Sequence, residues 1–277
     1  MYLKMRRSES ITSILLFVFN VFLTEKNVTE LPLKKILKIL EPFKKNETAV
    51  RMGLSRGVQN GLLVNDKKEH EVYYRLTDQA VQALRYWGDT MQTFQQRVAL
   101  QREKWSGKWN IACFSAAVTD ELAQSLRKLG YSVAAKHMWI SPYDFSGKVS
   151  ALAEEKGLAD SLYLFLGELT GSRQPGEIAL EIWPVEELNN KYKQYIAGLK
   201  NAIGKLDTGS FQEGTALPFL HQYGLQIFEI MQDDPQLPLQ LLPTDWSGIQ
   251  AAELFMTTRE QLLPKANAFI TGTIEMK

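Results

Sequence analysis

The sequence has little of the chemistry that catalytic and metal sites use. Its single cysteine, Cys113, excludes an intramolecular disulfide and a cysteine-rich zinc site, and its apolar neighbours predict a buried, inert side chain. His70, His137 and His221 are far apart and show no metal-ligand spacing. A P-loop, a G-x-G-x-x-G motif and a Ser-His-Asp or Cys-His pattern are also missing. We therefore expect no metal, no cofactor and no catalysis.

A long hydrophobic run is missing as well. The most apolar stretch, residues 14–23 (ILLFVFNVFL), is interrupted by Asn20 and falls well short of the ~20 residues that a membrane-spanning helix needs. Arg6 and Arg7 precede it, as in a signal peptide, but Glu9 lies in the segment that should be positive and no small-x-small cleavage site follows. We favour a buried helix, and we expect a cytoplasmic protein with no membrane partner.

Charge is distributed unevenly along the chain. The first 100 residues carry 16 Lys and Arg against 10 Asp and Glu, whereas the rest of the chain carries 16 against 21. The formal net charge of +1 conceals this difference. A basic N-terminal part is typical of a module that binds a polyanion such as DNA, although chance variation in surface charge is an equally simple reading.

Residues 46–61 (NETAVRMGLSRGVQNG) predict a helix with one apolar face. Asn46 is a suitable N-cap, Val50, Leu54 and Val58 recur every four residues, and Gly61 is a typical stop. Two apolar segments follow, residues 62–64 and 72–76, joined by a charged tip. A helix with arginines on its outer face and a basic-tipped hairpin after it indicates a winged helix-turn-helix.

Seven side chains of this block are candidates for DNA contact. Arginine can bond O6 and N7 of guanine with two parallel donors, small polar side chains and methionine can meet base edges or thymine methyls, and lysines at a hairpin tip can contact phosphates. Ordinary solvated or ion-paired surface residues remain the alternative. The candidates are Thr48, Arg51, Met52, Ser55, Arg56, Lys67 and Lys68.

The remaining N-terminal elements complete this prediction. Residues 8–24 predict a first helix, capped by Ser8 or Ser10. Residues 25–30 read as a polar connection, and Leu31-Pro32 opens a second helix whose first turn tolerates proline. Thr77-Asp78 caps a fourth helix that reaches about residue 101. We expect this helix to link the domains.

The middle of the chain alternates strands and helices. Strands are expected at 109–114, 131–135, 138–140 and 161–166, and helices at 119–129 and 143–156. This β-α-β-β-α-β order is the split-βαβ, ferredoxin-like plan. Residues 171–176 (GSRQPG) read as a loop, and the remainder is helical, with Pro264 expected to kink the last helix or start a new one.

These elements define an α+β fold with three domains. We expect an N-terminal winged helix-turn-helix with its linker helix over residues 1–100, a ferredoxin-like domain over residues 104–176 and a C-terminal α-helical domain over residues 177–277.

Two further sequence signatures point to a particular protein family. One is Trp105-Ser106-Gly107-Lys108-Trp109, which opens the ferredoxin-like part. The other is D-P-x-L-P-x-x-L-L-P-x-x-W-x-G, from Asp234 to Gly248. Together with the helix-and-hairpin block they resemble the PaaX family, the repressors of phenylacetate catabolism and their relatives, over almost the whole chain. Gly53 and Gly57 depart from the better helix formers usual at those places.

The resemblance implies a homodimeric transcriptional repressor that binds a palindromic double-stranded DNA operator. It also implies release by a small-molecule effector such as an aryl-acetyl or other acyl coenzyme A thioester. Side chains able to stack on or bond an effector are Trp183, His137, Arg173 and His221. For each of them we favour a structural role over contact with an effector.

The alternative function is a metal-dependent nuclease of the CRISPR-adaptation type with an added DNA-binding domain. The ferredoxin-like nucleases that the middle domain resembles need an aspartate at the end of the first strand. Here that strand ends in Phe114-Ser115-Ala116, which argues against catalysis.

Overall fold

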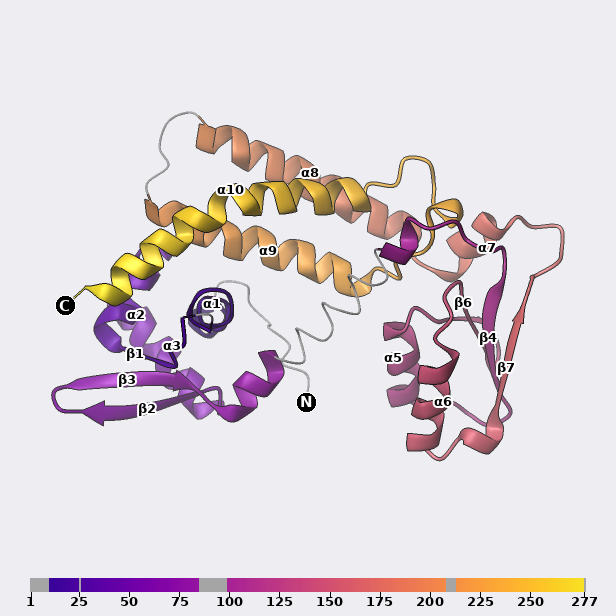
Figure 1. The fold of residues 1–277 in the computed structure, drawn as a ribbon, viewed down its shortest axis with the longest axis horizontal. Helices are drawn as coiled ribbons and strands as arrows, with labels where there is room; N and C mark the ends of the chain where they lie inside the picture. The colour runs from indigo at the N-terminus through magenta and orange to yellow at the C-terminus, as the bar shows by residue number, and fades with distance from the viewer. Residues whose placement is uncertain (1–9, 25, 85–98, 208–212, 277) are drawn as a thin grey trace. The chain divides into compact units, whose positions relative to one another are not determined.

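The computed structural model describes residues 10–24, 26–84, 99–207 and 213–276 as a mixture of helices and two sheets (Figure 1). The chain divides into two compact units. Unit 1 contains Met1–Gln92, Gln194–Glu229 and Ile249–Lys277, and unit 2 contains Thr93–Lys193 and Ile230–Gly248. Each unit therefore combines segments that are distant in the sequence.

Unit 1 begins with a buried helix, as the apolar stretch predicts. Helix α1 spans Ile11–Val18 and continues as a π-helical turn, η1, over Phe19–Leu23. The Ser10 side chain accepts a hydrogen bond from the Ser13 amide at 3.1 Å, which confirms Ser10 as the N-cap. Ile14, Leu15, Val18 and Leu23 are fully inaccessible to solvent, so this stretch is core.

The segment before the second helix differs from the prediction. Glu30–Pro32 forms a short strand, β1, which pairs antiparallel with β3, and helix α2 begins only at Leu33 and ends at Leu40. Pro32 is the N-cap of α2 and not a first-turn residue. An edge strand tolerates proline because one side of it needs no amide donor. A 3₁₀ turn, η2, follows at Glu41–Phe43.

The block around Asn46 folds into a helix and a hairpin. Helix α3 spans Glu47–Gln59, and strands β2 (Leu63–Lys68) and β3 (Glu71–Leu76) follow. The three strands form a sheet in the order β1-β3-β2. The next helix is capped by Thr77, whose Oγ1 accepts from the Ala80 amide at 3.1 Å. The predicted continuation of this helix toward residue 101 lies largely outside the described residues.

Three long helices supply the C-terminal part of the chain: α8 (Val185–Asp207), α9 (Ala216–Asp233) and α10 (Gly248–Glu275). They agree with the helical prediction, and Pro264 lies inside α10 without starting a new helix. Within unit 1, α9 and α10 contact the N-terminal elements. The Lys35 ammonium donates to the Ile274 carbonyl at the end of α10, a pairing across 239 positions.

Unit 2 contains a four-stranded antiparallel sheet in the order β5-β6-β4-β7. Helices α5 and α6 contribute to a core around Phe114, Leu126, Tyr131 and Trp139 (Figure 1). The elements follow the predicted β-α-β-β-α-β succession: β4 (Trp109–Phe114), α5 (Asp120–Lys128), β5 (Ser132–Ala135), β6 (Met138–Ser141), α6 (Ser146–Glu155) and β7 (Leu162–Gly167).

Two expectations for unit 2 are wrong. The predicted loop at 171–176 ends inside a helix, because Pro175 begins α7 (Pro175–Ile182), where its missing amide hydrogen costs nothing. Cys113 is only partly buried, since it faces the less covered side of β4. No helix of the described part of the chain combines the length and apolar character needed to cross a membrane.

Candidate nucleic-acid interface

Helix α3 has the two faces that its sequence predicts. Asn46 caps it, with its side-chain oxygen accepting from the Ala49 amide at 2.8 Å. Val50 and Leu54 are fully buried. Gly61, with a φ of 69°, ends the helix region in a left-handed conformation that favours glycine. The buried face fixes the rotation of α3 about its axis and thereby decides which side chains face solvent.

The outer face of α3 is open to solvent within the described chain. All five candidate side chains of this helix are exposed, and Met52 retains 52% of its accessible surface. The exposed side chains are Thr48, Arg51, Met52, Ser55 and Arg56.

The two arginines of this face differ in their electrostatic surroundings. The Arg51 guanidinium bonds the Glu47 carboxylate, with Nη2–Oε1 at 2.7 Å and Nε–Oε1 at 2.8 Å. Within the described residues Arg56 forms no ion pair. Glu47 was not among the predicted site residues, although a glutamate four positions before an arginine is a recognisable pairing signal. Arg56 is therefore immediately available to an anion, whereas Arg51 must first leave its partner.

The two glycines of α3 mark close approaches to other elements. A Cβ atom on Gly53 would lie 2.5 Å from Cβ of Ile11 in α1. A Cβ on Gly57 would lie 2.7 Å from Cδ1 of Leu63 in β2. Both distances are too short for a side chain without rearrangement. These glycines therefore let α1 and β2 pack directly against the inner face of α3.

The hairpin after α3 extends away from the neighbouring helices (Figure 1). Lys67 and Lys68 belong to β2, and the turn itself is Glu69-His70, so the strands are longer than predicted. The Lys68 ammonium bonds the Glu30 carboxylate of β1 and lies 5.1 Å from the centre of the Tyr73 ring. Lys67 is exposed, and no pairing of its side chain occurs among the described residues.

The four candidate effector-binding residues lie in different surroundings. His137 is exposed in the turn between β5 and β6, with a φ of 65°. Arg173 forms an ion pair with Glu181 of α7. Trp183 is buried and stacks on Trp109, with ring centres 5.9 Å apart. No hydrogen bond, ion pair or ring contact joins any two of the four within the part of the chain that the structure describes.

His221, the fourth candidate, is buried in unit 1. Its Nε2 lies 3.2 Å from the Ser13 hydroxyl, and its ring packs against Phe17 and Phe43. Burial lowers the pKa of His221 to about 4, and the positive charge of Lys45 acts in the same direction. The ring is therefore neutral at ordinary pH and links α1 to α9.

The residues of the D-P-x-L-P…W-x-G signature pack around helix α8 in unit 2. The Tyr192 hydroxyl donates to Asp234 Oδ2 at 2.7 Å, and the Tyr192 ring packs edge-on against Trp246. Burial, together with the charge of Asp234, raises the pKa of Tyr192. The Asp234 Oδ1 accepts from the Gln236 amide, which holds Gln236 at a φ of 52°.

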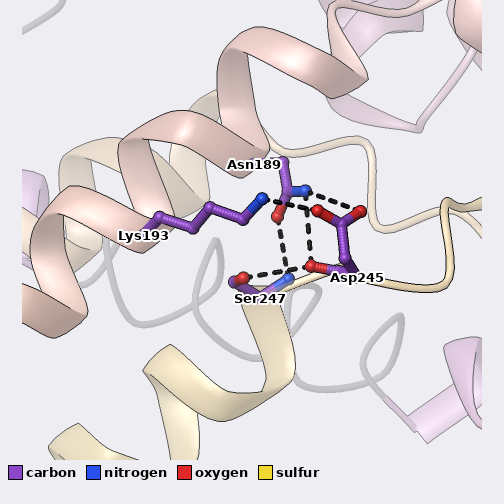
Figure 2. A network of polar contacts seen from close by, with 4 residues as sticks. All are labelled: Asn189, Lys193, Asp245 and Ser247. Atoms are coloured by element: carbon purple, nitrogen blue, oxygen red, sulfur yellow. Dashed lines mark hydrogen bonds and ion pairs between the residues drawn. The ribbon is translucent and has the colours of Figure 1, made fainter.

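Figure 2 shows a second polar cluster in the same part of the chain, made by Asn189, Lys193, Asp245 and Ser247. Lys193 bonds Asp245 at 2.5 Å, and Asn189 Oδ1 accepts from the Ser247 amide at 2.9 Å. Lys193 and Asn189 belong to α8, whereas Asp245 and Ser247 lead into α10. The signature therefore joins the start of α10 to α8, which is a structural role.

Among the described residues, no group of three or more histidine, cysteine, aspartate or glutamate side chains could hold a metal ion. Ser115, which stands where the nuclease alternative needs a carboxylate, donates its backbone amide to the Ser161 carbonyl at 2.8 Å.

Three family models match the chain in succession. The PaaX-like protein model matches residues 10–80, the PaaX protein central Cas2-like domain matches residues 102–179, and the PaaX-like protein C-terminal domain matches residues 183–272. The chain therefore belongs to the PaaX family.

A curated relative agrees with this assignment, and a solved structure shares the fold. The transcriptional repressor PaaX of Escherichia coli (strain K12) is 24% identical over 250 residues, which are 87% of this chain and 77% of the relative. The uncharacterized protein Rv0674 from Mycobacterium tuberculosis has a similar fold, with a TM-score of 0.57 and 17% identity, covering 93% of this chain and 99% of that one.

Proposed function

We propose that this chain is a DNA-binding transcriptional regulator that acts as a repressor by placing α3 in the major groove of an operator. The observation that carries the proposal is the open outer face of α3, on which Arg51 and Arg56 are both exposed. The repressor named among the relatives supports the same class of function. A bidentate arginine–guanine contact contributes about 1–3 kcal/mol of discrimination between bases.

The finer description of the fold belongs to this proposal. We assign residues 1–100 to a winged helix-turn-helix with its linker helix, residues 104–176 to a ferredoxin-like domain and residues 177–277 to a helical domain. The hairpin after α3 supports the first assignment. The strand order β5-β6-β4-β7 supports the second. A cytoplasmic homodimer on a palindromic site completes the scheme.

The test begins with selection of bound duplexes from a random DNA pool. The double variant Arg51→Ala, Arg56→Ala should then bind the selected duplex at least about a hundredfold more weakly, because two charge-assisted contacts are lost. Arg127→Ala, an exposed arginine of α5 in unit 2, is the matched control and should bind as the wild type does. Equal binding by the double variant and the wild type at physiological salt would refute the role of α3.

The effector is proposed to be a small molecule such as an acyl coenzyme A thioester, which releases the protein from DNA. Trp183, His137, Arg173 and His221 remain candidates for contacts with it, and the separate surroundings of these side chains favour testing each one alone. Thermal-shift screening of acyl coenzyme A thioesters, followed by release of the bound duplex, would identify the effector class.

The nuclease alternative has its own experiment. DNA incubated with the protein and Mg²⁺ or Mn²⁺ should remain intact, because the first strand of the sheet is followed by Ser115 and not by an aspartate. Measurable turnover would reverse the ranking of the two functions.

A further inference from the structure

Glu47 and Arg51 form an ion pair on the outer face of α3. One carboxylate oxygen of Glu47, Oε1, accepts from Arg51 Nη2 at 2.7 Å and from Arg51 Nε at 2.8 Å. Both side chains stay more than half exposed, at 59% for Glu47 and 57% for Arg51. Exposed pairs of this kind contribute little to the stability of a fold, so the consequence of the pair lies in what the outer face binds.

The pair occupies only one edge of the Arg51 guanidinium. This group carries several N–H donors in one plane, and the Glu47 oxygen takes the edge formed by Nε and Nη2. The other edge, formed by Nη1 and the second hydrogen of Nη2, has no partner within the described residues. Two parallel donors on one edge are what O6 and N7 of guanine accept. Arg51 can therefore bind a guanine while Glu47 holds it.

The same carboxylate disfavours a phosphate at Arg51. Guanine presents uncharged acceptors, whereas a phosphate is an anion and is repelled by Glu47. To bind a phosphate, Arg51 has to exchange one anion for another, and the Glu47 carboxylate is left beside a like charge. Arg56, which forms no ion pair among the described residues, has no such restriction. The two arginines of α3 thus differ in the group of DNA that suits them.

The positions of the two arginines along α3 agree with this difference. The N-terminal residues of a recognition helix contact base edges. Glu47 is the first residue of α3 and Arg51 follows about one turn later, whereas Arg56 belongs to the last turn. Helical geometry places Arg56 roughly 140° around the axis from Arg51. The two side chains therefore leave the helix in different directions.

We propose that Glu47 is a positioning residue for sequence specificity, which holds Arg51 for a guanine of the operator and keeps it from the phosphates of unrelated DNA. The inference rests on the proposed DNA-binding function. Glu47 strengthens the correct contact by orienting the guanidinium beforehand, and it weakens binding to other sequences by repelling their backbone. A residue that served only the fold would change both kinds of binding in the same direction.

The test measures binding of the full chain to the selected duplex and to a random duplex at several salt concentrations. Arg51→Ala identifies the guanine, because discrimination against an exchange of that base pair is lost with the arginine. Glu47→Ala should lower this discrimination at least about fivefold and raise the affinity for the random duplex at least about twofold. It should also steepen the slope of log K against log salt for the random duplex by about one, because the freed Arg51 can then contact a phosphate.

Two further variants make the result specific to this ion pair. Glu47→Gln removes the charge but keeps an oxygen that can accept from Arg51, so it should raise the affinity for the random duplex and keep most of the discrimination. Glu187→Ala is the matched control, because it breaks an exposed pair of the same spacing, between Glu187 and Lys191 of α8 at 2.8 Å. It should leave both quantities unchanged. Thermal unfolding checks that each variant is folded.

Unchanged discrimination by Glu47→Ala would overturn the inference. So would a loss of discrimination on adding Glu47→Ala to a chain that already carries Arg51→Ala, because Glu47 would then read a base itself, as a carboxylate can do with cytosine. Loss of discrimination with Arg56→Ala in place of Arg51→Ala would assign the guanine to the other arginine and overturn it too.

These results are distinct from a failure of the proposed function. In each of them the wild type still binds the selected duplex, so the DNA-binding function stands and only the role of Glu47 is refuted. A wild type that selects no duplex from the random pool would refute both.

Discussion

Gly53 shows how a residue that weakens a helix locally can stabilise the fold. Alanine is favoured over glycine by about 0.8–1.0 kcal/mol in a helix interior. At position 53, however, an added Cβ would lie 2.5 Å from Cβ of Ile11, and overpacking typically costs about 1–3 kcal/mol. The close approach of α1 therefore outweighs helix propensity at this position.

We expect Gly53→Ala to lower the free energy of unfolding by up to about 2 kcal/mol, the overpacking cost less the gain in helix propensity. Gly198→Ala is the control, because a Cβ at this position of α8 meets no atom within 4 Å. It should be neutral or stabilising. Urea denaturation of both variants measures the difference, and a stabilised Gly53→Ala protein would contradict the packing of α1 on α3.

His221 leads to a prediction about the pH dependence of stability. Its pKa is lowered from 6.5 to about 4 in the folded chain, so the unfolded chain binds a proton more readily. The contribution of the neutral ring to stability is therefore complete above about pH 6.5 and is lost as the pH falls toward 4.

The free energy of unfolding should drop by about 2 kcal/mol between pH 7 and pH 5 through this residue alone. His221→Gln cannot titrate in this range and should lack that part of the pH dependence. The comparison of wild type and variant separates the pH dependence due to His221 from that due to the carboxylates, because the carboxylates titrate in both proteins. Parallel pH profiles for the two proteins would show that the ring is protonated without penalty.

At the scale of elements, the β2–β3 hairpin has two neighbouring lysines with different partners. Lys68 is held by Glu30 and by the Tyr73 ring, whereas Lys67 is exposed. If the hairpin contacts DNA phosphates, Lys67 can do so without losing an existing interaction, and Lys68 cannot.

Lys67→Gln should therefore weaken DNA binding more than Lys68→Gln does. It should also reduce the slope of log K against log salt by about one. Binding of the selected duplex at several salt concentrations measures both quantities. A greater effect of Lys68→Gln would mean that the Lys68–Glu30 ion pair opens when DNA binds. If neither variant changes DNA binding, the hairpin does not contact DNA.

At the scale of the whole molecule, the proposal requires two copies of α3. One recognition helix covers only a few base pairs, whereas a symmetric dimer reads two half-sites separated by about 10 base pairs or a multiple of that distance. Light scattering should therefore give twice the chain mass of 31.6 kDa, and the selected sequences should be palindromic. A chain that stays monomeric and selects an asymmetric site would contradict the dimer.

Much of the fold could be predicted because its signals are local. Asn46 and Thr119 cap helices with their own side chains, and Gly61 and Gly130 adopt the positive φ that ends them. The alternation of strands and helices in the middle part predicted the element order of unit 2. The exposed face of α3 followed from the spacing of Val50, Leu54 and Val58, since burial of one face exposes the other.

Other features could not be predicted because they depend on partners far along the chain. β1 is a strand because it pairs with β3. Its three residues are too few to show the alternating pattern that predicts a strand. Cys113 is half-buried because of the side of the sheet it faces. The candidate effector residues were chosen by chemistry alone, and chemistry does not say which side chains share a space.

The sequence by itself therefore determined the order of the elements, the helix caps, the outward face of α3 and the family. Short-range patterns and motifs indicate all of these features. Only the tertiary structure decided why Gly53 is a glycine, why His221 stays neutral and why Lys35 bonds a carbonyl at the end of α10. The physical reason is that each of the latter depends on contacts between segments more than 40 residues apart, up to the 239 positions that separate Lys35 from Ile274.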